Sequence, residues 1–278
     1  MLFRLTLAIS TFLLAQVAFA SPEQPTIVEF PSGTLTLRGE LFKPDGDGPF
    51  PAVLYNHGSA PGMLNSQASS AIGPMFARKG WVFFMPYRRG QGLSEDQGPY
   101  IMDEISSAKW SFFGSASETM TKLLSTDHLD DQLAALAWLK KQNFVQENEI
   151  ATMGNSFGGV EVVLGMARAN YCAGVDASGG AQSWKHSDEL QRLMKDAVKK
   201  IRRPVFFFQA ANDYDLSPSK VLSSEMRNSG TIAQVKIYPS FGGSEKAGHS
   251  FPYRGASIWF KDAFAFLSQY CSSASDRN

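Results

Sequence analysis

A serine flanked by glycines is the first residue of this chain that could do covalent chemistry. Ser156 stands in Gly154-Asn155-Ser156-Phe157-Gly158, which matches the pattern G-x-S-x-G. That pattern places a serine on a sharp turn between a strand and a helix, where the glycines avoid clashes with nearby backbone. The N-terminus of the following helix supplies backbone donors and a dipole that favour an oxyanion. We therefore predict that Ser156 is a nucleophile.

A serine nucleophile needs a base, and the chain offers four histidines. His249 follows the last predicted strand, in a loop that should open on the same edge of a sheet as Ser156. His57 follows an earlier strand and opens on that edge too, but it precedes the nucleophile. His128 and His186 stand near helix starts, as packing or exposed residues would. We predict that His249 is the base.

An orienting acid is expected at the end of the apolar strand 204–210. Asp213 lies at the exit of this strand, and Asp215 lies closer to the following helix. The position of Asp213 suits the acid of a triad, whereas the position of Asp215 suits a helix cap. The order Ser156, Asp213, His249 then follows.

Two backbone N–H groups should receive the oxyanion that forms when Ser156 attacks. One belongs to Phe157, directly after the nucleophile. The second is predicted at Ser59, in the Gly- and Pro-containing loop after the strand 50–56. The alternative is that this loop is only a turn.

The elements that must position these residues alternate along the chain. Apolar runs between turn signals predict strands over 26–30, 35–42, 50–56, 81–87, 149–154, 173–177, 204–210 and 232–238. Helical signals predict helices over 68–79, 127–142 with Asp127 as its cap, 157–169, 187–200, 217–228 and 254–270. This alternation predicts an α/β fold with a mainly parallel sheet, helices on both faces, and a site at the carboxyl ends of the strands.

Residues 94–126 contain no clear strand but several large apolar side chains. Trp110 and Phe112 are the largest of them, with Met102 and Ile105 nearby. We expect this stretch to cover the site and to line an apolar acyl pocket. A packed connecting loop is the alternative.

The first twenty residues have the features of an export signal. Arg4 precedes a mostly apolar run over 5–17, and Ala18-Phe19-Ala20 supplies a small-x-small cleavage pattern. The run is shorter than the roughly 20 residues that span a bilayer, although an uncleaved anchor is the alternative. We predict one domain over 21–278, without a membrane span, in the periplasm or outside the cell. In that oxidising setting Cys172 and Cys271 could pair or remain two separate thiols.

Charge and motif content exclude several other classes of protein. The 278 residues hold 26 basic and 26 acidic side chains, which leaves no basic excess for nucleic acid or anionic membranes. No pattern for a phosphate loop, a dinucleotide fingerprint or a metal-binding His-x-x-x-His occurs. We expect neither metal nor organic cofactor, and a small acyl compound as substrate.

Together these segments resemble the α/β-hydrolase superfamily over residues 26–271, and within it the dienelactone hydrolase family and its prolyl-oligopeptidase-like relatives. The resemblance is carried by the segments 57–59, 87–94, 131–139, 154–159, 212–213 and 248–251. It implies a mostly parallel sheet of about eight strands and acyl transfer to water at an ester, lactone, thioester or amide. Two departures are Ser156, where dienelactone hydrolases proper use cysteine, and a long segment, 240–247, before Gly248.

The resemblance also bears on three further residues. Its Arg-Gly-x-Gly-x-Ser segment lies near the active-site mouth, so Arg88 is a possible substrate contact, with a solvated turn as the alternative. The family fold brings its closing helix near the start of the strand after the nucleophile helix, which implies a disulfide between Cys172 and Cys271. Three functions remain at this point: a small-ester or lactone hydrolase, a peptidase of the prolyl-oligopeptidase type, and a non-catalytic binding protein on this scaffold.

Overall fold

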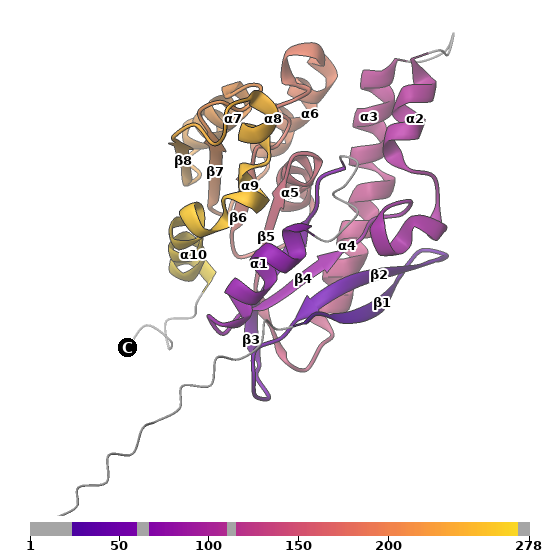
Figure 1. Ribbon diagram of the computed structural model, residues 1–278, viewed down its shortest axis with the longest axis vertical. Coiled ribbons are helices and arrows are strands. Elements are labelled where there is room, and N and C mark those ends of the chain that lie inside the picture. Colours follow the sequence, from indigo (N-terminus) through magenta and orange to yellow (C-terminus); the bar gives the residue numbers. More distant parts are fainter. Residues whose placement is uncertain (1–23, 60–66, 110–114, 272–278) are drawn as a thin grey trace, which may run out of the picture.

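A computed structural model describes residues 24–59, 67–109 and 115–271 (Figure 1). The predicted export signal, Trp110 and Phe112 lie outside the described residues. In the described part of the chain, eight strands form one sheet in the order β1-β2-β4-β3-β5-β6-β7-β8. These are β1 (Thr26–Ser32), β2 (Leu35–Phe42), β3 (Phe50–Asn56), β4 (Val82–Pro86), β5 (Val145–Asn155), β6 (Gly174–Ala177), β7 (Val205–Ala210) and β8 (Ala233–Tyr238).

The sheet is antiparallel at one end and parallel elsewhere. Strands β1 and β2 form a hairpin, and β2 pairs with β4 in the antiparallel sense. All pairs from β4 to β8 are parallel, so their carboxyl ends lie on one edge. The predicted mainly parallel α/β sheet of about eight strands is confirmed.

Helices cover both faces of the sheet (Figure 1). The helices are α1 (Gln67–Ala77), α2 (Ile101–Ala108), α3 (Ala116–Ser125), α4 (Asp127–Lys140), α5 (Phe157–Arg168), α6 (Asp188–Val198), α7 (Ser217–Asn228), α8 (Glu245–His249), α9 (Phe251–Arg254) and α10 (Ala256–Cys271), with short 3-10 turns at Gly92–Gln97 and Trp184–His186. Helices α2 to α7 pack over one face, and α1, α9 and α10 pack over the other.

Alternation along the buried strands explains this two-sided core. In β7, Val205 and Phe207 belong to the apolar cluster on the α2–α7 face, whereas Phe206 and Phe208 belong to the α1–α10 cluster. Successive side chains of a strand point to opposite faces, so a continuous apolar run must be covered on both. This burial fixes the strand ends from which the site residues project.

The structure differs from the sequence-based expectations at three places. The stretch 94–126, for which no helix was predicted, forms α2 and α3, which pack on each other, with α3 also against α4 and α6. Thr126, not Asp127, is the N-cap of α4, and Asp127 is its first residue. His249 was expected in a loop, but it ends the short helix α8, because Ser244 caps that helix by accepting a hydrogen bond from the Ala247 N–H.

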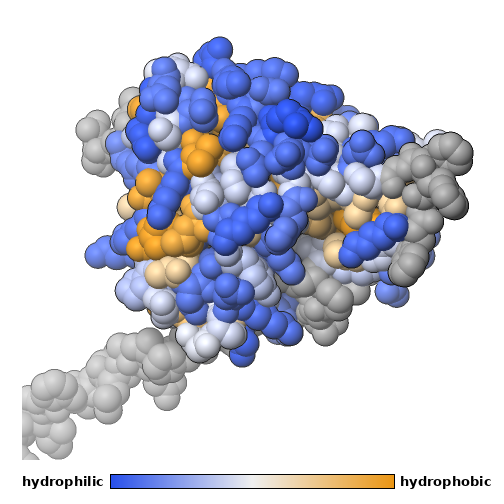
Figure 2. All heavy atoms as spheres, turned by 90° about the horizontal axis from the view of Figure 1, so that it is seen from above, coloured by the Kyte–Doolittle hydropathy of each residue, from blue (hydrophilic) through white to orange (hydrophobic). Residues whose placement is uncertain are grey.

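Figure 2 shows the molecule from above, and most of this face is hydrophilic, with apolar side chains gathered in smaller patches. In the described part of the chain, no helix is both long enough and apolar enough to cross a membrane.

Candidate active site

Ser156 occupies a strained turn between β5 and α5. Its φ of 56° and ψ of −120° are rare for a residue with a side chain, and such strain persists only where the surroundings impose it. A Cβ on Gly158 would lie 1.9 Å from the Asn56 carbonyl oxygen, and one on Gly154 would lie 2.3 Å from the Gly158 carbonyl oxygen. Glycine is therefore required at both positions that flank the serine, as the G-x-S-x-G pattern predicts.

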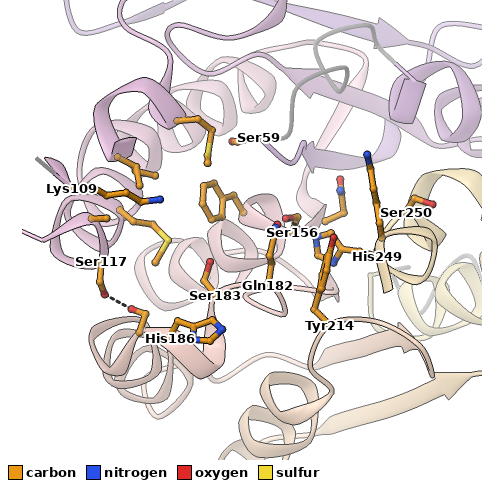
Figure 3. A pocket seen from close by; sticks show the side chains of 18 of the residues that line it. Ser59, Lys109, Ser117, Ser156, Gln182, Ser183, His186, Tyr214, His249 and Ser250 are labelled. Atoms are coloured by element: carbon orange, nitrogen blue, oxygen red, sulfur yellow. Dashed lines mark hydrogen bonds between the residues drawn. The ribbon is translucent and has the colours of Figure 1, made fainter. Parts of the chain in front are cut away.

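His249 and Asp213 complete a chain of hydrogen bonds that ends at Ser156. His249 Nε2 lies 3.0 Å from Ser156 Oγ, and His249 Nδ1 lies 2.8 Å from Asp213 Oδ1. The three residues come from the ends of β5, β7 and α8, far apart in the sequence, and Figure 3 shows Ser156 and His249 next to each other. The structure thus brings together the three residues that the sequence proposed as nucleophile, acid and base.

The carboxylate of Asp213 is held in its ionised form. Burial raises its pKa, but the hydrogen bond and charge of His249, together with hydrogen bonds from Gln209 and Ser178, outweigh burial and leave the pKa below its ordinary value. Gln209 Nε2 donates to Asp213 Oδ2 at 2.9 Å, and the Tyr214 N–H donates to Oδ1 at 2.8 Å. A fixed carboxylate of this kind can orient an imidazole.

Asp215 was expected to cap α7, but Leu216 is the N-cap of that helix and Asp215 lies one residue before it. Its Oδ1 accepts a hydrogen bond from the Ser217 N–H at 2.8 Å, at the start of α7. Gln209 Nε2 also donates to the Asp215 carbonyl oxygen at 2.9 Å. The Gln209 side chain therefore ties the segment 213–215 together. Sequence reasoning missed Gln209, although a glutamine near the end of the apolar strand β7 was a visible signal.

The predicted oxyanion donors lie next to the serine. The Phe157 N–H is in the first turn of α5, whose donors have no intrahelical acceptor. Ser59 is buried, follows β3 and lines the same cavity as Ser156 (Figure 3). A Cβ on Gly58 would lie 3.3 Å from Ser156 Cβ, so the loop of Ser59 approaches the serine closely. The placement fits the predicted pair of donors.

His57, the other histidine on this edge, is buried and bound locally. Its Nδ1 lies 2.6 Å from the Gly58 carbonyl oxygen, and its Nε2 accepts the Arg88 N–H at 3.3 Å. Burial, with the nearby charge of Arg88, holds the pKa of His57 well below its ordinary value. A neutral ring whose two nitrogens are both engaged has a structural role here.

Arg88 does not contact the cavity, contrary to its interpretation as a substrate contact. Its side chain is only 2% exposed, and its Nη2 donates to the His57 carbonyl oxygen at 2.8 Å and to Ser59 Oγ at 3.1 Å. The alternative of a solvated turn is also wrong, since Arg89 donates to both carboxylate oxygens of Asp131. Both arginines are held by long-range contacts that the sequence does not display.

A cavity of about 530 Å³ opens beside Ser156. One wall is apolar and carries Met102, Ile105, Met120 and Phe157 from α2, α3 and α5. Lys109, at the end of α2, and His186 lie on the side of the cavity away from His249, and Tyr214 stands beside His249 with ring centroids 5.2 Å apart (Figure 3). The described parts of 94–126 therefore line this cavity, as expected, while Trp110 and Phe112 fall outside the described residues.

The two cysteines are joined at the opposite edge of the sheet. Cys172, just before β6, and Cys271, at the end of α10, form a disulfide with their Cα atoms 5.0 Å apart. Among the described residues, no three His, Cys, Asp or Glu side chains gather in a way that could hold a metal ion.

Known structures share this fold at low sequence identity. The acylaminoacyl peptidase of Pyrococcus horikoshii is 18% identical over 90% of this chain, with a TM-score of 0.64, but the match spans only 42% of the peptidase. A putative dienelactone hydrolase of Klebsiella pneumoniae is 17% identical, with a TM-score of 0.63, over 88% of this chain and 98% of that one. An esterase of Pyrococcus furiosus is 15% identical, with a TM-score of 0.62, over 90% and 93%.

A search of curated proteins finds no match. The family model described as "Dienelactone hydrolase family" matches residues 37–275, a range that includes Ser59, Ser156, Asp213 and His249. With its eight-stranded, mostly parallel sheet, the chain has the α/β-hydrolase fold and belongs to the dienelactone hydrolase family.

Proposed function

We propose that the protein is an exported serine hydrolase that cleaves a small ester or lactone. The observation that carries this proposal is the continuous chain of hydrogen bonds from Asp213 through His249 to Ser156, at the mouth of a partly apolar cavity. In this arrangement, Ser156 Oγ attacks the acyl carbon while His249 Nε2 takes its proton. Asp213 holds the imidazole with Nε2 toward the serine and stabilises the imidazolium that forms.

The backbone donors and a water molecule complete the reaction. The N–H groups of Phe157 and Ser59 stabilise the oxyanion as the carbonyl carbon becomes tetrahedral. Collapse of this intermediate transfers the proton from His249 to the leaving alkoxide and leaves an acyl group on Ser156. Water, activated by His249, then attacks the acyl-enzyme and releases the acid in the same way.

An apolar acyl group suits the cavity better than a polypeptide does. Met102, Ile105 and Met120 line the same cavity as Ser156, and methionine side chains adapt to acyl chains of different shape. The dienelactone hydrolase and esterase neighbours are matched over nearly their full lengths, whereas the peptidase is matched over less than half of its length. Both observations favour an ester or lactone over a peptide bond.

Export is supported by two independent features. Residues 1–20 have the composition of a cleavable signal, and the pairing of Cys172 with Cys271 suits an oxidising compartment. Expression with and without residues 1–20, followed by fractionation of periplasm and medium, tests this part of the proposal. Retention of the full-length chain in the cytoplasm would contradict it.

Labelling with a fluorophosphonate, located by mass spectrometry, tests the chemistry. A single adduct on Ser156 that is absent from Ser156→Ala is the expected result. Hydrolysis of p-nitrophenyl esters, lactones and aminoacyl anilides then ranks the substrates, and we expect the esters and lactones to be cleaved fastest. Faster cleavage of anilides would favour the peptidase, whereas a folded protein without an adduct would favour a binding protein.

A further inference from the structure

Two adjacent arginines, Arg88 and Arg89, are used in opposite ways. The Arg89 side chain donates to Asp131 through Nε at 2.9 Å and Nη2 at 2.8 Å, so its charge is met by a carboxylate. Arg88 is more deeply buried, yet the acceptors of its side chain are the His57 carbonyl oxygen and Ser59 Oγ. Its Nε and Nη1 have no hydrogen-bond partner within the described ranges.

A buried arginine without a bound carboxylate is costly, because its charge has lost water without gaining a close counterion. Glu161, on α5 and fully buried, raises the pKa of Arg88 more than Asp131 does, but burial raises the pKa of Glu161 itself to about 8, so near neutral pH it holds a proton and is not a counterion. Neither carboxylate forms an ion pair with Arg88. The hydrogen bonds that the Arg88 side chain forms therefore all go to the loop that carries Ser59.

The contacts of Ser59 explain what this arrangement achieves. Its Oγ accepts from Arg88, and its carbonyl oxygen accepts from the Tyr100 hydroxyl. The His57 carbonyl oxygen, two residues earlier, is also fixed by Arg88. Arg88 and Tyr100 thus hold the carbonyl groups of the peptides on either side of the Gly58–Ser59 peptide, which restricts the orientation of the Ser59 N–H.

We propose that Arg88 is a positioning residue that holds the loop 57–59 so that the Ser59 N–H faces the oxyanion formed at Ser156. The inference rests on the proposed hydrolase function and adds a residue that does not touch the substrate. Because the contact with the oxyanion forms only in the transition state, disturbing it should lower kcat and leave KM nearly unchanged. A residue with a merely structural role would instead lower the amount of folded enzyme.

Replacement of the two arginines by lysine gives a matched pair of variants. Arg88→Lys keeps the charge but cannot reach both acceptors, and we expect kcat for an ester to fall about 10- to 100-fold, since loss of one oxyanion donor costs ~10²–10³. A trifluoromethyl ketone, which forms an oxyanion adduct with serine, should inhibit Arg88→Lys more weakly by a similar factor. Arg89→Lys should keep kcat within about threefold of the wild-type value, because Arg89 does not contact the loop.

Circular dichroism and thermal melting show which variants are folded. If Arg88→Lys does not fold, Ser59→Ala removes only the Oγ acceptor and keeps the N–H, and we expect kcat to fall several-fold with an unchanged KM. The inference would be overturned if folded Arg88→Lys had the kcat and the inhibition of the wild type, or if only its KM changed. If Arg88→Lys does not fold, the same outcomes are judged on folded Ser59→Ala. Fluorophosphonate labelling of Ser156 in the wild type is measured first. If Ser156 is not labelled, the proposed hydrolase function itself is overturned. If Ser156 is labelled and Arg88→Lys has the kcat and the inhibition of the wild type, only the role of Arg88 is overturned.

Discussion

The two edges of the parallel sheet are built on different principles. The carboxyl edge, where β3, β5, β6 and β7 end, carries the polar residues of the site. Ser156 and Ser178, the two non-glycine residues with positive φ in the described ranges, both lie there. The amino edge instead carries the Cys172–Cys271 disulfide. Nearby, α10 packs its aromatic side chains on the sheet, as in the contact of Phe206 with Phe266.

The contrast shows that the residues of the site and the features that stabilise the fold lie at opposite edges of the same sheet. Backbone strain and buried polar groups cost stability, and they persist only where the surrounding structure imposes them. Apolar packing and a covalent link at the other edge offset that cost. Substitutions at the carboxyl edge should therefore change activity more than stability, and substitutions at the amino edge should do the reverse.

Ser156→Ala should give the largest effect on activity. Loss of the nucleophile of a serine triad lowers kcat by roughly 10⁶-fold, since the remaining residues cannot form an acyl-enzyme. The melting temperature should stay within a few degrees of the wild-type value, because alanine adopts the same backbone with the same strain. Ester hydrolysis and calorimetry on the same sample check both statements. Activity above about 1% of wild type would place the nucleophile elsewhere.

Asp213→Asn and Asp215→Asn form a matched pair two residues apart. An amide at 213 favours the wrong tautomer of His249, and kcat should fall about 10⁴-fold with little change in KM. Asp215→Asn keeps an oxygen that can accept from the Ser217 N–H, so its kcat should remain near wild type. Steady-state kinetics of both variants distinguish the roles, and equal losses would contradict the assignment of Asp213 as the orienting acid.

The double variant Cys172→Ala/Cys271→Ala tests the amino edge. The disulfide closes a separation of 99 residues, and such a link restricts the unfolded chain by about 4–5 kcal/mol in the chain-entropy model. Urea unfolding should show most of that loss, while kcat below the melting transition stays at the wild-type value. Wild-type protein reduced with dithiothreitol is the control, because reduction breaks the disulfide without the cavity that alanine leaves. A fall in kcat of the folded variant would show that the two edges are coupled.

Strand ends made most of the site predictable from the sequence. Ser156, Asp213 and His249 each follow an apolar run with turn residues, and parallel strands bring such ends to one edge. The eight strand segments were recognisable because each is a short apolar run between turn signals. The local pattern G-x-S-x-G also carries its own geometry, since both glycines avoid contacts shorter than 3 Å.

Long-range contacts explain what the sequence could not reveal. Arg88 looks like a residue of an exposed turn, but its acceptors lie 29 and 31 residues earlier, so its burial depends on the folded loop at 57–59. Helices α2 and α3 escaped prediction because each is short and is stabilised by packing on the other, with α3 also packed on α4 and α6.

Glu161→Gln tests the stability cost of the polar groups behind the carboxyl edge. Burial raises the pKa of Glu161 to about 8, opposed by Arg88 and reinforced by Asp131 and Asp130. The native state therefore holds a proton that the unfolded chain releases near its ordinary value of 4.5. The contribution of this group to the free energy of unfolding is therefore fully present below pH 4.5, and it is lost as the pH rises through about 8.

The comparison with glutamine isolates this contribution, because glutamine does not titrate. Relative to wild type, Glu161→Gln should gain stability as the pH increases from 4.5 to 8. Urea unfolding across this range provides the measurement. The effect should be smaller than that of the disulfide, because the charge of Arg88 offsets part of the cost of burying the ionised carboxylate. Parallel curves for wild type and Glu161→Gln would show that Glu161 is ionised in the native state.

Met102→Ala should have the smallest effect and should act on selectivity alone. Met102 is partly buried on α2 and lines the apolar wall of the cavity, so its truncation makes room for a longer acyl chain. One methylene in an apolar pocket is worth about 1–3 kcal/mol, and the ratio of kcat/KM between long and short p-nitrophenyl esters should rise about tenfold. Met75→Ala, at a partly buried methionine on the other face of the sheet, provides the control for general loosening. An equal change of the ratio in both variants would mean that chain-length selectivity follows the rigidity of the whole molecule and not the wall formed by α2 and α3.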